Sequence, residues 1–446
     1  MADPALIPRP LRDLFGHPRG LTVLFLTETW AQFSYFGMQA MLVYYMTKQL
    51  HFSQPAASAL YGGYAAFAYL TPLLGGVIAD RWLGQGRSVI AGSVLMALGH
   101  FALAFEPGFF PGLFLVGLGN GFFLPSTITQ VGYLYAEGDS RRDRAYSVYY
   151  VGVNIGGFLA PLVCGTIGEL YGWHYGFAVA GVGMLVGLAI YLCNRSALPA
   201  EAQLLKSSTT RAPPLDSGDR RAIGNLFIIA AIVVLFRIAY EQSGNTIALW
   251  ADSQTDRTVH LAGRSLLIPA TWFQSINPFL IFALTPAITW WWARQARRGK
   301  EPPPVAKMAA GAALGGAAFL LMIGAALQAS SHGTASWLWL VGFFALLTAG
   351  ELYILPIGLS VFSRLAPARV ASAMIGVWYL AKFAGGLFSG WLGAYWHMLP
   401  HVAFFLVGAG FAFLAALALA VAHRLGVLPR RAPSLDVPVP MVVHQS

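Results

Sequence analysis

One feature recurs along the whole sequence: apolar stretches of about 20 residues, the length that an α-helix needs to cross a bilayer. Only 10% of the residues are charged, against about 25% in soluble domains. Because lipid offers no hydrogen-bond partners to an open backbone, such stretches cross the membrane as α-helices. We therefore predict an all-α membrane protein. Its twelve predicted transmembrane helices are 21–47, 56–78, 87–106, 110–134, 145–168, 174–193, 223–250, 266–292, 306–328, 336–363, 370–396 and 401–423.

Basic residues are distributed unevenly between the two sides of these predicted helices. An even number of crossings places both termini on one side, and that side carries most of the 28 Lys and Arg residues. The opposite loops hold only Lys48, Arg257 and Arg264. Since cytoplasmic loops are enriched in Lys and Arg, both termini are predicted to be cytoplasmic. The formal charge of +10 then reflects topology, and we expect no binding of nucleic acid.

A polar segment rich in Ser, Pro and Arg divides the predicted helices into six and six. Two bundles that rock about a central site are a common layout of secondary transporters. The linker is too short for an extra pair of transmembrane helices, which needs about 40 residues. The predicted parts are an N-terminal cytoplasmic tail (1–20), an N-terminal six-helix bundle (21–193), a cytoplasmic linker (194–222), a C-terminal six-helix bundle (223–423) and a C-terminal cytoplasmic tail (424–446).

A glycine-rich segment, GGVIADRWLGQGR (75–87), follows the second predicted helix. It resembles the signature of the major facilitator superfamily, which implies the fold of that superfamily. Physically the segment is a tight turn whose Asp80 and Arg81 can pair with a neighbouring helix end and stabilise one state of a rocking motion. We therefore predict that Asp80 and Arg81 are gating residues, not substrate ligands.

Six further motifs follow one another along the predicted helices. They are TETWAQFSYFGM (27–38), YYVGVNIG (149–156), YEQSG (240–244), SINP (275–278), GELY (350–353) and GVWYL (376–380). In type and order they resemble the proton-dependent oligopeptide transporter (POT/PTR) family, whose signatures include E-x-x-E-R-F-x-Y-Y-G, F-Y-x-x-I-N-x-G, F-E-Q-x-G and G-x-W-F-L. The resemblance covers nearly the whole chain.

Five ionisable side chains fall inside the predicted helices: Glu28, Arg237, Glu241, Glu351 and Lys382. Charged groups are costly inside a membrane, so each of them is a candidate functional residue. The family resemblance implies that Glu351 binds the α-amino group of a peptide, and that Glu241 is the carboxylate that carries the proton. Glu28 is the second proton-coupling candidate. For Glu351 the alternative is a hydrogen bond between helices.

Polar and aromatic side chains complete the predicted substrate site. Asn154 and Asn277 can each donate to and accept from a peptide bond, although an Asn in a membrane helix also serves to join helices. The resemblance implies that Tyr35, Tyr69 and Trp378 form the apolar walls of side-chain pockets. Helix packing is the alternative for each of these rings.

The chain departs from the family pattern at three positions. Ala31 and Gln32 replace the second Glu and the Arg of the first signature, and Leu124 replaces the Lys that the family places before Pro125. In the family these residues form an ion-pair network tied to proton coupling, and the two bases hold the peptide carboxylate. Losing one member would leave an unpaired charge, whereas losing all three avoids that cost. Gln32 remains among the predicted substrate-binding residues.

Two bases stand in the C-terminal half instead. Arg237 precedes Glu241 by four residues, and Lys382 follows Trp378 by four, so the members of each pair share a helix face. We predict that Arg237 and Lys382 bind substrate and take over the carboxylate-binding role. The alternative is that Arg237 only neutralises Glu241 and that Lys382 lies against the bundle.

These features predict a secondary active transporter of the bacterial inner membrane that imports di- or tripeptides, or peptide-like substrates, by proton-coupled alternating access. Two alternatives stay within transport: a family member that moves a non-peptide nitrogenous metabolite or drug, and a proton-independent peptide facilitator. A membrane receptor or scaffold is the rival from another class, and the five intramembrane charges argue against it.

The sequence carries no phosphate-binding loop, no metal-spaced His or Cys cluster and no nucleophile motif. We therefore expect no enzyme activity, no cofactor and no metal. The expected partners are the substrate, protons and the lipid bilayer, and the protein is expected to be a monomer.

Overall fold

The computed structural model describes residues 16–136, 139, 141–198, 215–261 and 263–427. Most of the two predicted tails (1–20 and 424–446) and of the predicted linker (194–222) lies outside these residues. The account of the fold therefore concerns the two predicted bundles.

Six long helical stretches form the N-terminal half. They are α1 (Arg19–Tyr44) with a π-helical extension (Tyr45–Gln49), α2 (Gln54–Ile78) with a second such extension (Ala79–Leu83), α3 (Gln85–Leu103), α4 (Phe109–Tyr133), α5 (Arg141–Ala160) continuing through Pro161–Gly165 into α6 (Thr166–Tyr171), and α7 (Trp173–Cys193). Each stretch lies within a few residues of its predicted bounds, because long apolar runs specify membrane helices strongly.

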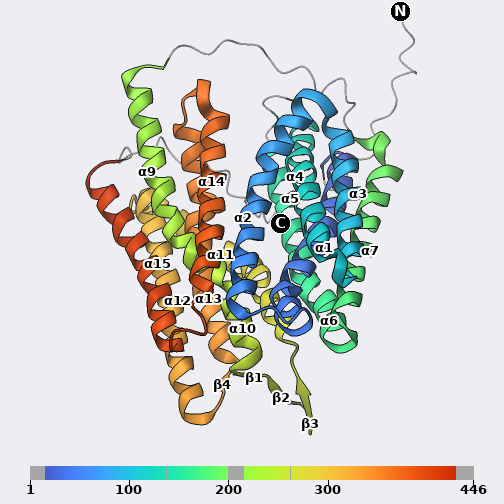
Figure 1. Cartoon of the computed structure of the whole chain (residues 1–446). Coiled ribbons are helices and arrows are strands. Elements are labelled where there is room, and N and C mark those ends of the chain that lie inside the picture. Colours follow the sequence, from blue (N-terminus) through green and yellow to red (C-terminus); the bar gives the residue numbers. More distant parts are fainter. Residues whose placement is uncertain (1–15, 137–138, 140, 199–214, 262, 428–446) are drawn as a thin grey trace, which may run out of the picture.

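The C-terminal half holds six corresponding stretches. They are α9 (Ser217–Tyr240) with α10 (Thr246–Ser253), α11 (Ile276–Arg297), α12 (Pro304–His332), α13 (Leu338–Leu365), α14 (Ala371–Gly393) and α15 (His401–Arg424). Four short strands lie at one end of this half: β1 (Thr255–Asp256) pairs in parallel with β4 (Ala335–Ser336), and β2 (Thr258–Leu261) pairs antiparallel with β3 (Arg264–Leu267). We call this end of the molecule the strand end and the opposite end the linker end (Figure 1).

Two predicted helices differ from the structure in detail. The stretch predicted as one helix over 223–250 is broken by a 3₁₀ turn at Glu241–Gly244. The helix predicted over 266–292 begins only at Ile276, because β3 and a 3₁₀ turn at Ala270–Ser275 precede it. Apolar composition alone does not distinguish such strands and turns from the first turns of a helix.

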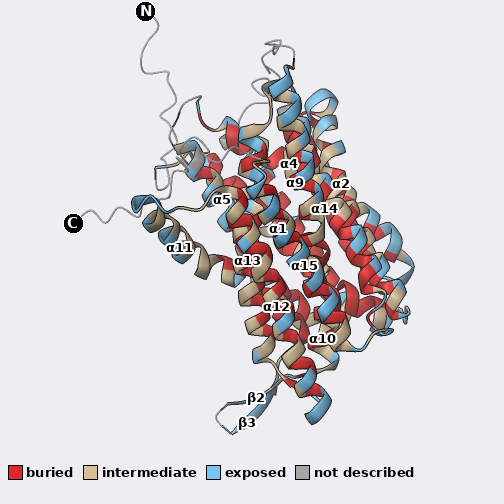
Figure 2. Ribbon diagram, turned by 90° about the vertical axis from the view of Figure 1, so that its left-hand side faces the viewer, coloured by how far each residue is buried: buried red, intermediate tan, exposed pale blue. Residues whose placement is uncertain are grey.

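The described helices have the dimensions and surface of a membrane protein. Nine of the helical segments in the described part of the chain are both long enough and apolar enough to cross a bilayer. Helices α1, α11 and α14 have 26, 22 and 23 residues and carry polar or charged residues such as Glu28, Arg294 and Lys382. Figure 2 shows buried residues between the helices and exposed residues on their outer faces. The arrangement agrees with twelve predicted crossings.

The two halves stand side by side in Figure 1 and meet along two helix pairs, α2 with α14 and α5 with α11. The first pair packs backbone to backbone: a Cβ added to Gly62 would lie 2.4 Å from the Cα of Gly390. Small residues allow this approach, as they do in other membrane helix pairs. The contact brings side chains of α2 close to those of α9 and α14.

Candidate functional site

The break between α9 and α10 positions the first site residue, Glu241. The turn ends at Gly244, where an added Cβ would lie 1.9 Å from the hydroxyl oxygen of Tyr61, so any larger residue would displace the Tyr61 ring. Beyond it, the Asn245 carboxamide oxygen accepts a hydrogen bond of 2.8 Å from Ser58 on α2. Broken helices in transporters are tolerated where protein groups satisfy the freed backbone and side chains. Glu241 is therefore the first residue of a break that α2 helps to fix.

Glu241 belongs to a buried charged cluster. Arg237, one turn earlier on α9, donates to the Glu241 carboxylate and, at 2.6 Å, to the hydroxyl of Tyr69 on α2. Tyr69 donates in turn to Glu241 over 3.2 Å. The guanidinium also lies over the rings of Tyr69 and Tyr240, at 5.2 and 4.8 Å from their centroids, and Arg237 is only 1% exposed. A buried cation is stabilised in this way by an ion pair, a hydrogen bond and two aromatic faces.

Lys382 on α14 is the second base of the predicted site, and its surroundings differ from those of Arg237. Its ammonium group lies 5.5 Å from the ring centroid of Tyr69 and 5.2 Å from that of Tyr379. Among the residues that the structure describes, no carboxylate lies within ion-pair distance of it. Lys382 is therefore a cation held by aromatic faces that remains available to an anionic ligand.

Glu351 on α13 is nearly buried, at 7% exposure. Its carboxylate accepts a hydrogen bond of 2.7 Å from the Asn277 carboxamide on α11, and the same nitrogen of Asn277 reaches the Thr348 hydroxyl at 2.9 Å. No Lys or Arg of the described chain lies within ion-pair distance of Glu351. A carboxylate with a neutral donor and no countercharge is suited to bind an ammonium group.

Glu28 on α1 lies in a third environment, built from neutral donors. Its carboxylate accepts hydrogen bonds from Gln32 at 2.7 Å, from Thr127 on α4 at 3.2 Å and from Tyr149 on α5, and Thr127 and Tyr149 bond to each other. Glu28 is fully buried, and no base of the described residues pairs with it. Gln32 is thus committed to Glu28 in this structure.

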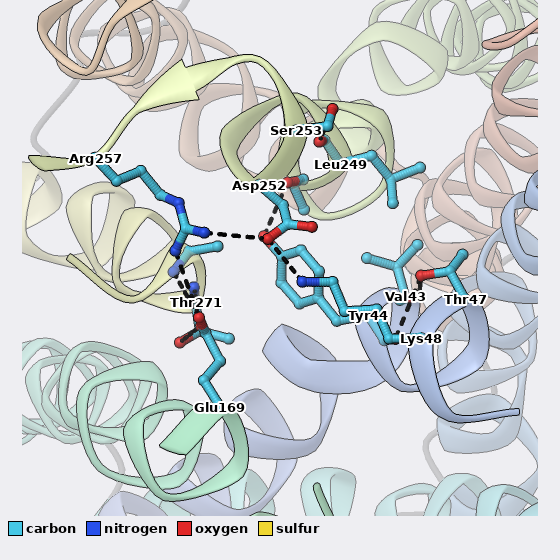
Figure 3. Close-up of polar contacts among 12 residues, drawn as sticks. Val43, Tyr44, Thr47, Lys48, Glu169, Leu249, Asp252, Ser253, Arg257 and Thr271 are labelled. Carbon is cyan, nitrogen blue, oxygen red and sulfur yellow. Dashed lines mark hydrogen bonds and ion pairs between the residues drawn. The ribbon is translucent and has the colours of Figure 1, made fainter. Parts of the chain in front are cut away.

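A fourth polar cluster joins the two halves at the strand end (Figure 3). Lys48 pairs with Asp252 at 2.7 Å, and Arg257 lies between Asp252 at 3.4 Å and Glu169 at 3.6 Å. Glu169 also accepts hydrogen bonds from the Thr271 hydroxyl and from two backbone N–H groups at the start of the 3₁₀ turn that precedes α11. The strand end is therefore closed by charged and capping contacts between the halves.

Sequence comparison decides the family of the chain. The POT family model matches residues 87–209 and 202–397, which is more than half of the sequence. The chain belongs to the POT family. A peptide transporter of Yersinia enterocolitica, YePEPT, is 34% identical over 463 residues, covering 86% of this chain and 89% of that protein. A di-/tripeptide transporter of Lactococcus lactis subsp. cremoris is 31% identical, covering 83% of this chain and 88% of its own length.

Solved structures of POT proteins have the same fold. The crystal structure of a peptide transporter POT in complex with sulfate matches with a TM-score of 0.86 and 30% identity, over 95% of this chain and 98% of that chain. A POT family transporter in complex with 5-aminolevulinic acid matches with a TM-score of 0.84 and 26% identity, over 93% and 98%. The predicted family, the major facilitator fold and the assignment as a transporter, not an enzyme, are thereby confirmed.

The remaining predicted residues of this POT transporter lie in varied places. Asn154 donates to the backbone oxygen of Tyr150 at 2.9 Å, and Tyr35 packs edge-on against Phe36. Trp378 is 2% exposed, with its ring 5.2 Å from that of Phe362, which matches the packing alternative in this state.

The two predicted gating residues lie in the exposed π-helical extension of α2 at the linker end. There Asp80 accepts a hydrogen bond of 2.6 Å from Gln85, across a turn in which Gly84 has a φ of 81°. That φ favours glycine and allows the chain to reverse between α2 and α3.

Several residues of these clusters were not predicted from the sequence. Thr127 follows Pro125 by two residues and lies close to Leu124, where the chain departs from the family pattern, and this proximity was the only signal for it in the sequence. Lys48 and Arg257 were recognised only as two of the three basic residues on the sparsely charged side. Glu169 gave no signal, because it lies in α6 just beyond the predicted helix 145–168.

Proposed function

We propose that this transporter imports di- or tripeptides, or similar zwitterions, by proton-coupled alternating access. The observation that carries the proposal is a carboxylate and a cation on neighbouring helices, α13 and α14, neither of which has a charged partner within ion-pair distance among the described residues. Glu351 is contacted by a neutral donor, and Lys382 is contacted by aromatic faces. A free peptide has an ammonium group at one end and a carboxylate at the other, so each end meets a charge of opposite sign.

The proposed roles follow from these partners. Glu351 anchors the substrate amino group, with Asn277 beside it to donate to the peptide. Lys382 binds the substrate carboxylate, and Arg237 is a second base whose release depends on Glu241. Asn154, Tyr35, Gln32 and Trp378 stay predicted substrate-binding residues that other conformations would bring into contact.

Glu241 is proposed as the proton carrier, with Glu28 as the second candidate. The support for Glu241 is its ion pair with Arg237, because a proton that neutralises Glu241 releases the guanidinium for another anion. Proton binding and substrate binding would then favour each other. The support for Glu28 is its complete burial without a countercharge.

The proposed orientation places the linker end in the cytoplasm and the strand end in the periplasm of a bacterial inner membrane. The density of Lys and Arg in the loops supports it. Two six-helix bundles, 21–193 and 223–423, would then rock about the central charges, with Asp80 and Arg81 stabilising one state at the cytoplasmic end. A monomer suffices for this mechanism.

A non-peptide zwitterion is the second candidate substrate class. A similar POT structure is described as a complex with 5-aminolevulinic acid, which shares an amine and a carboxylate with a peptide but has no peptide bond. The same pair of charges would accept it. A proton-independent facilitator remains the other alternative.

Counterflow in liposomes tests the proposal. Purified protein is reconstituted with unlabelled dipeptide inside, and uptake of labelled dipeptide is followed with and without a pH gradient. The proposal predicts exchange in both conditions and accumulation only with the gradient. Exchange without gradient-driven accumulation would favour the facilitator. In parallel liposomes, exchange of labelled 5-aminolevulinate without exchange of labelled dipeptide would favour the non-peptide alternative, and no flux of either compound would refute the proposed function.

A further inference from the structure

Three residues of α2 form hydrogen bonds to the C-terminal half, two of them near the strand end and one deeper in the molecule. Near the strand end, Gln54 donates to the backbone oxygen of Gly393, and Ser58 donates to Asn245. The next such bond along α2 is formed by Tyr69, which lies about 16 Å deeper, at 1.5 Å per residue. Tyr69 therefore forms the innermost of these three bonds, and its position is the inner limit of the contact that they make.

The bond at this limit differs chemically from the others, because a titratable group takes part in it. The Tyr69 hydroxyl accepts from Arg237 at 2.6 Å and donates to Glu241 at 3.2 Å. Both bonds are made to charged groups, and such bonds are about twice as strong as neutral ones. A proton on Glu241 removes the charge that attracts the Tyr69 hydroxyl and the guanidinium together. The contact between α2 and α9 at this depth is hence strongest when Glu241 is ionised.

We infer that the Tyr69 hydroxyl is a positioning group that makes closure of the strand end depend on the protonation state of Glu241. The inference rests on the proposed role of Glu241 as the proton carrier. With Glu241 ionised, α2 is tied to α9 and the strand end stays closed. With Glu241 protonated, the tie weakens and the halves separate there.

Other charged and titratable groups surround the Tyr69 hydroxyl on several helices. Arg237 on α9 and Glu241 in the turn after α9 contact it directly, and Lys382 on α14 lies 5.5 Å from the centroid of its ring. Tyr240 on α9 holds Arg237 from another face, and Glu351 on α13 acts on Lys382 by charge. Tyr61 and Tyr64 precede Tyr69 on α2 itself, and Tyr35 faces them from α1. Glu241 is the one carboxylate of the described residues that bonds to this hydroxyl, so its proton controls the tie.

Tyr69→Phe tests the inference, because it removes the hydroxyl and keeps the ring faces that hold Arg237 and Lys382. The matched control is Tyr64→Phe, since the Tyr64 hydroxyl is buried without a hydrogen-bond partner in the described structure. Spin labels replace the exposed residues His51 and His397, one on each half at the strand end, in a variant without Cys164 and Cys193. The distance distribution between the labels is measured by electron paramagnetic resonance as the pH is lowered.

In the control variant Tyr64→Phe, the strand end is expected to be closed at high pH and to open as the pH is lowered. At high pH, Tyr69→Phe is expected to raise the ratio of open to closed molecules by about tenfold, because it loses a hydrogen bond to a charged group. This ratio is expected to change little as the pH is lowered. In liposomes the gradient-driven accumulation of labelled dipeptide by Tyr69→Phe should fall much further than its exchange, when each is expressed relative to the control. If Tyr69→Phe follows the control in both the distance profile and accumulation, the inference is overturned. If the unmodified protein exchanges no dipeptide, the proposed function fails, and the distance measurement still decides the role of Tyr69.

Discussion

The two halves of this transporter differ in the groups that stabilise their buried charged side chains. Inside the described helices of the N-terminal half, Glu28 is surrounded by the neutral donors Gln32, Thr127 and Tyr149. The C-terminal half instead contains the bases Arg237 and Lys382 and the carboxylates Glu241 and Glu351, with an ion pair between Arg237 and Glu241. A lone carboxylate in a dry site is tolerated when it is neutral or fully hydrogen-bonded, whereas a cation such as Arg requires a partner. We therefore propose that the charges that act in transport lie in the C-terminal half.

The largest expected effect on stability comes from removing one member of the ion pair between Arg237 and Glu241. Arg237→Met leaves Glu241 buried beside Tyr69 without a countercharge, which should reduce the free energy of unfolding by about 3 kcal/mol at neutral pH. The loss should shrink as the pH falls, because Glu241 can then take up a proton. Chemical denaturation in detergent measures both effects.

The control for that experiment is the double variant Arg237→Met with Glu241→Gln. It removes both charges together and should be more stable at neutral pH than Arg237→Met alone, since no unpaired charge is left. A double variant that is as unstable as the sum of the single variants would show that the two charges do not stabilise each other.

The next largest effect is expected on dipeptide affinity, when the carboxylate proposed to bind the substrate amino group is removed. Glu351→Gln keeps the shape of the side chain and the neighbouring Asn277 but removes the charge, so dipeptide affinity should fall by at least about 30-fold, or 2 kcal/mol. Binding to the purified protein by calorimetry measures the change. Glu28→Gln, which removes the carboxylate of the N-terminal half, should change affinity far less. Equal losses in the two variants would contradict the contrast between the halves.

Recognition of the substrate carboxylate is expected to give a smaller effect. The unmodified protein should prefer a free dipeptide to its C-terminally amidated analogue, and Lys382→Ala should lose about tenfold in affinity for the free acid only. Arg237→Ala should affect the preference less, because Arg237 is already paired. If the unmodified protein binds acid and amide equally, the carboxylate is not recognised and the role proposed for Lys382 is wrong.

The sequence predicted the helices well because each crossing depends on a long apolar run. It did not predict the break at Glu241–Gly244, since that turn requires the approach of Tyr61 to Gly244, a contact between distant segments. The late start of α11 was missed for the same kind of reason, because the strand β3 forms only by pairing with β2.

The sequence predicted which residues form the candidate site but not which of them contact one another. The cost of charge in a membrane identified Glu28, Arg237, Glu241, Glu351 and Lys382 without any structure. Which groups meet depends on how the helices pack and rotate. Tyr69 was predicted as a pocket wall, and the structure shows that its hydroxyl also joins α2 to Arg237 and Glu241. The neutral shell of Glu28 likewise involves three helices.

The central claim, that proton coupling depends on the C-terminal half, is tested most directly by comparing Glu241→Gln with Glu28→Gln in liposomes. Both variants are assayed for exchange of labelled dipeptide, which reports that they are folded, and for accumulation driven by a pH gradient. The account predicts that both exchange substrate, that Glu28→Gln still accumulates it, and that Glu241→Gln does not. Full accumulation by Glu241→Gln together with its loss in Glu28→Gln would contradict the account.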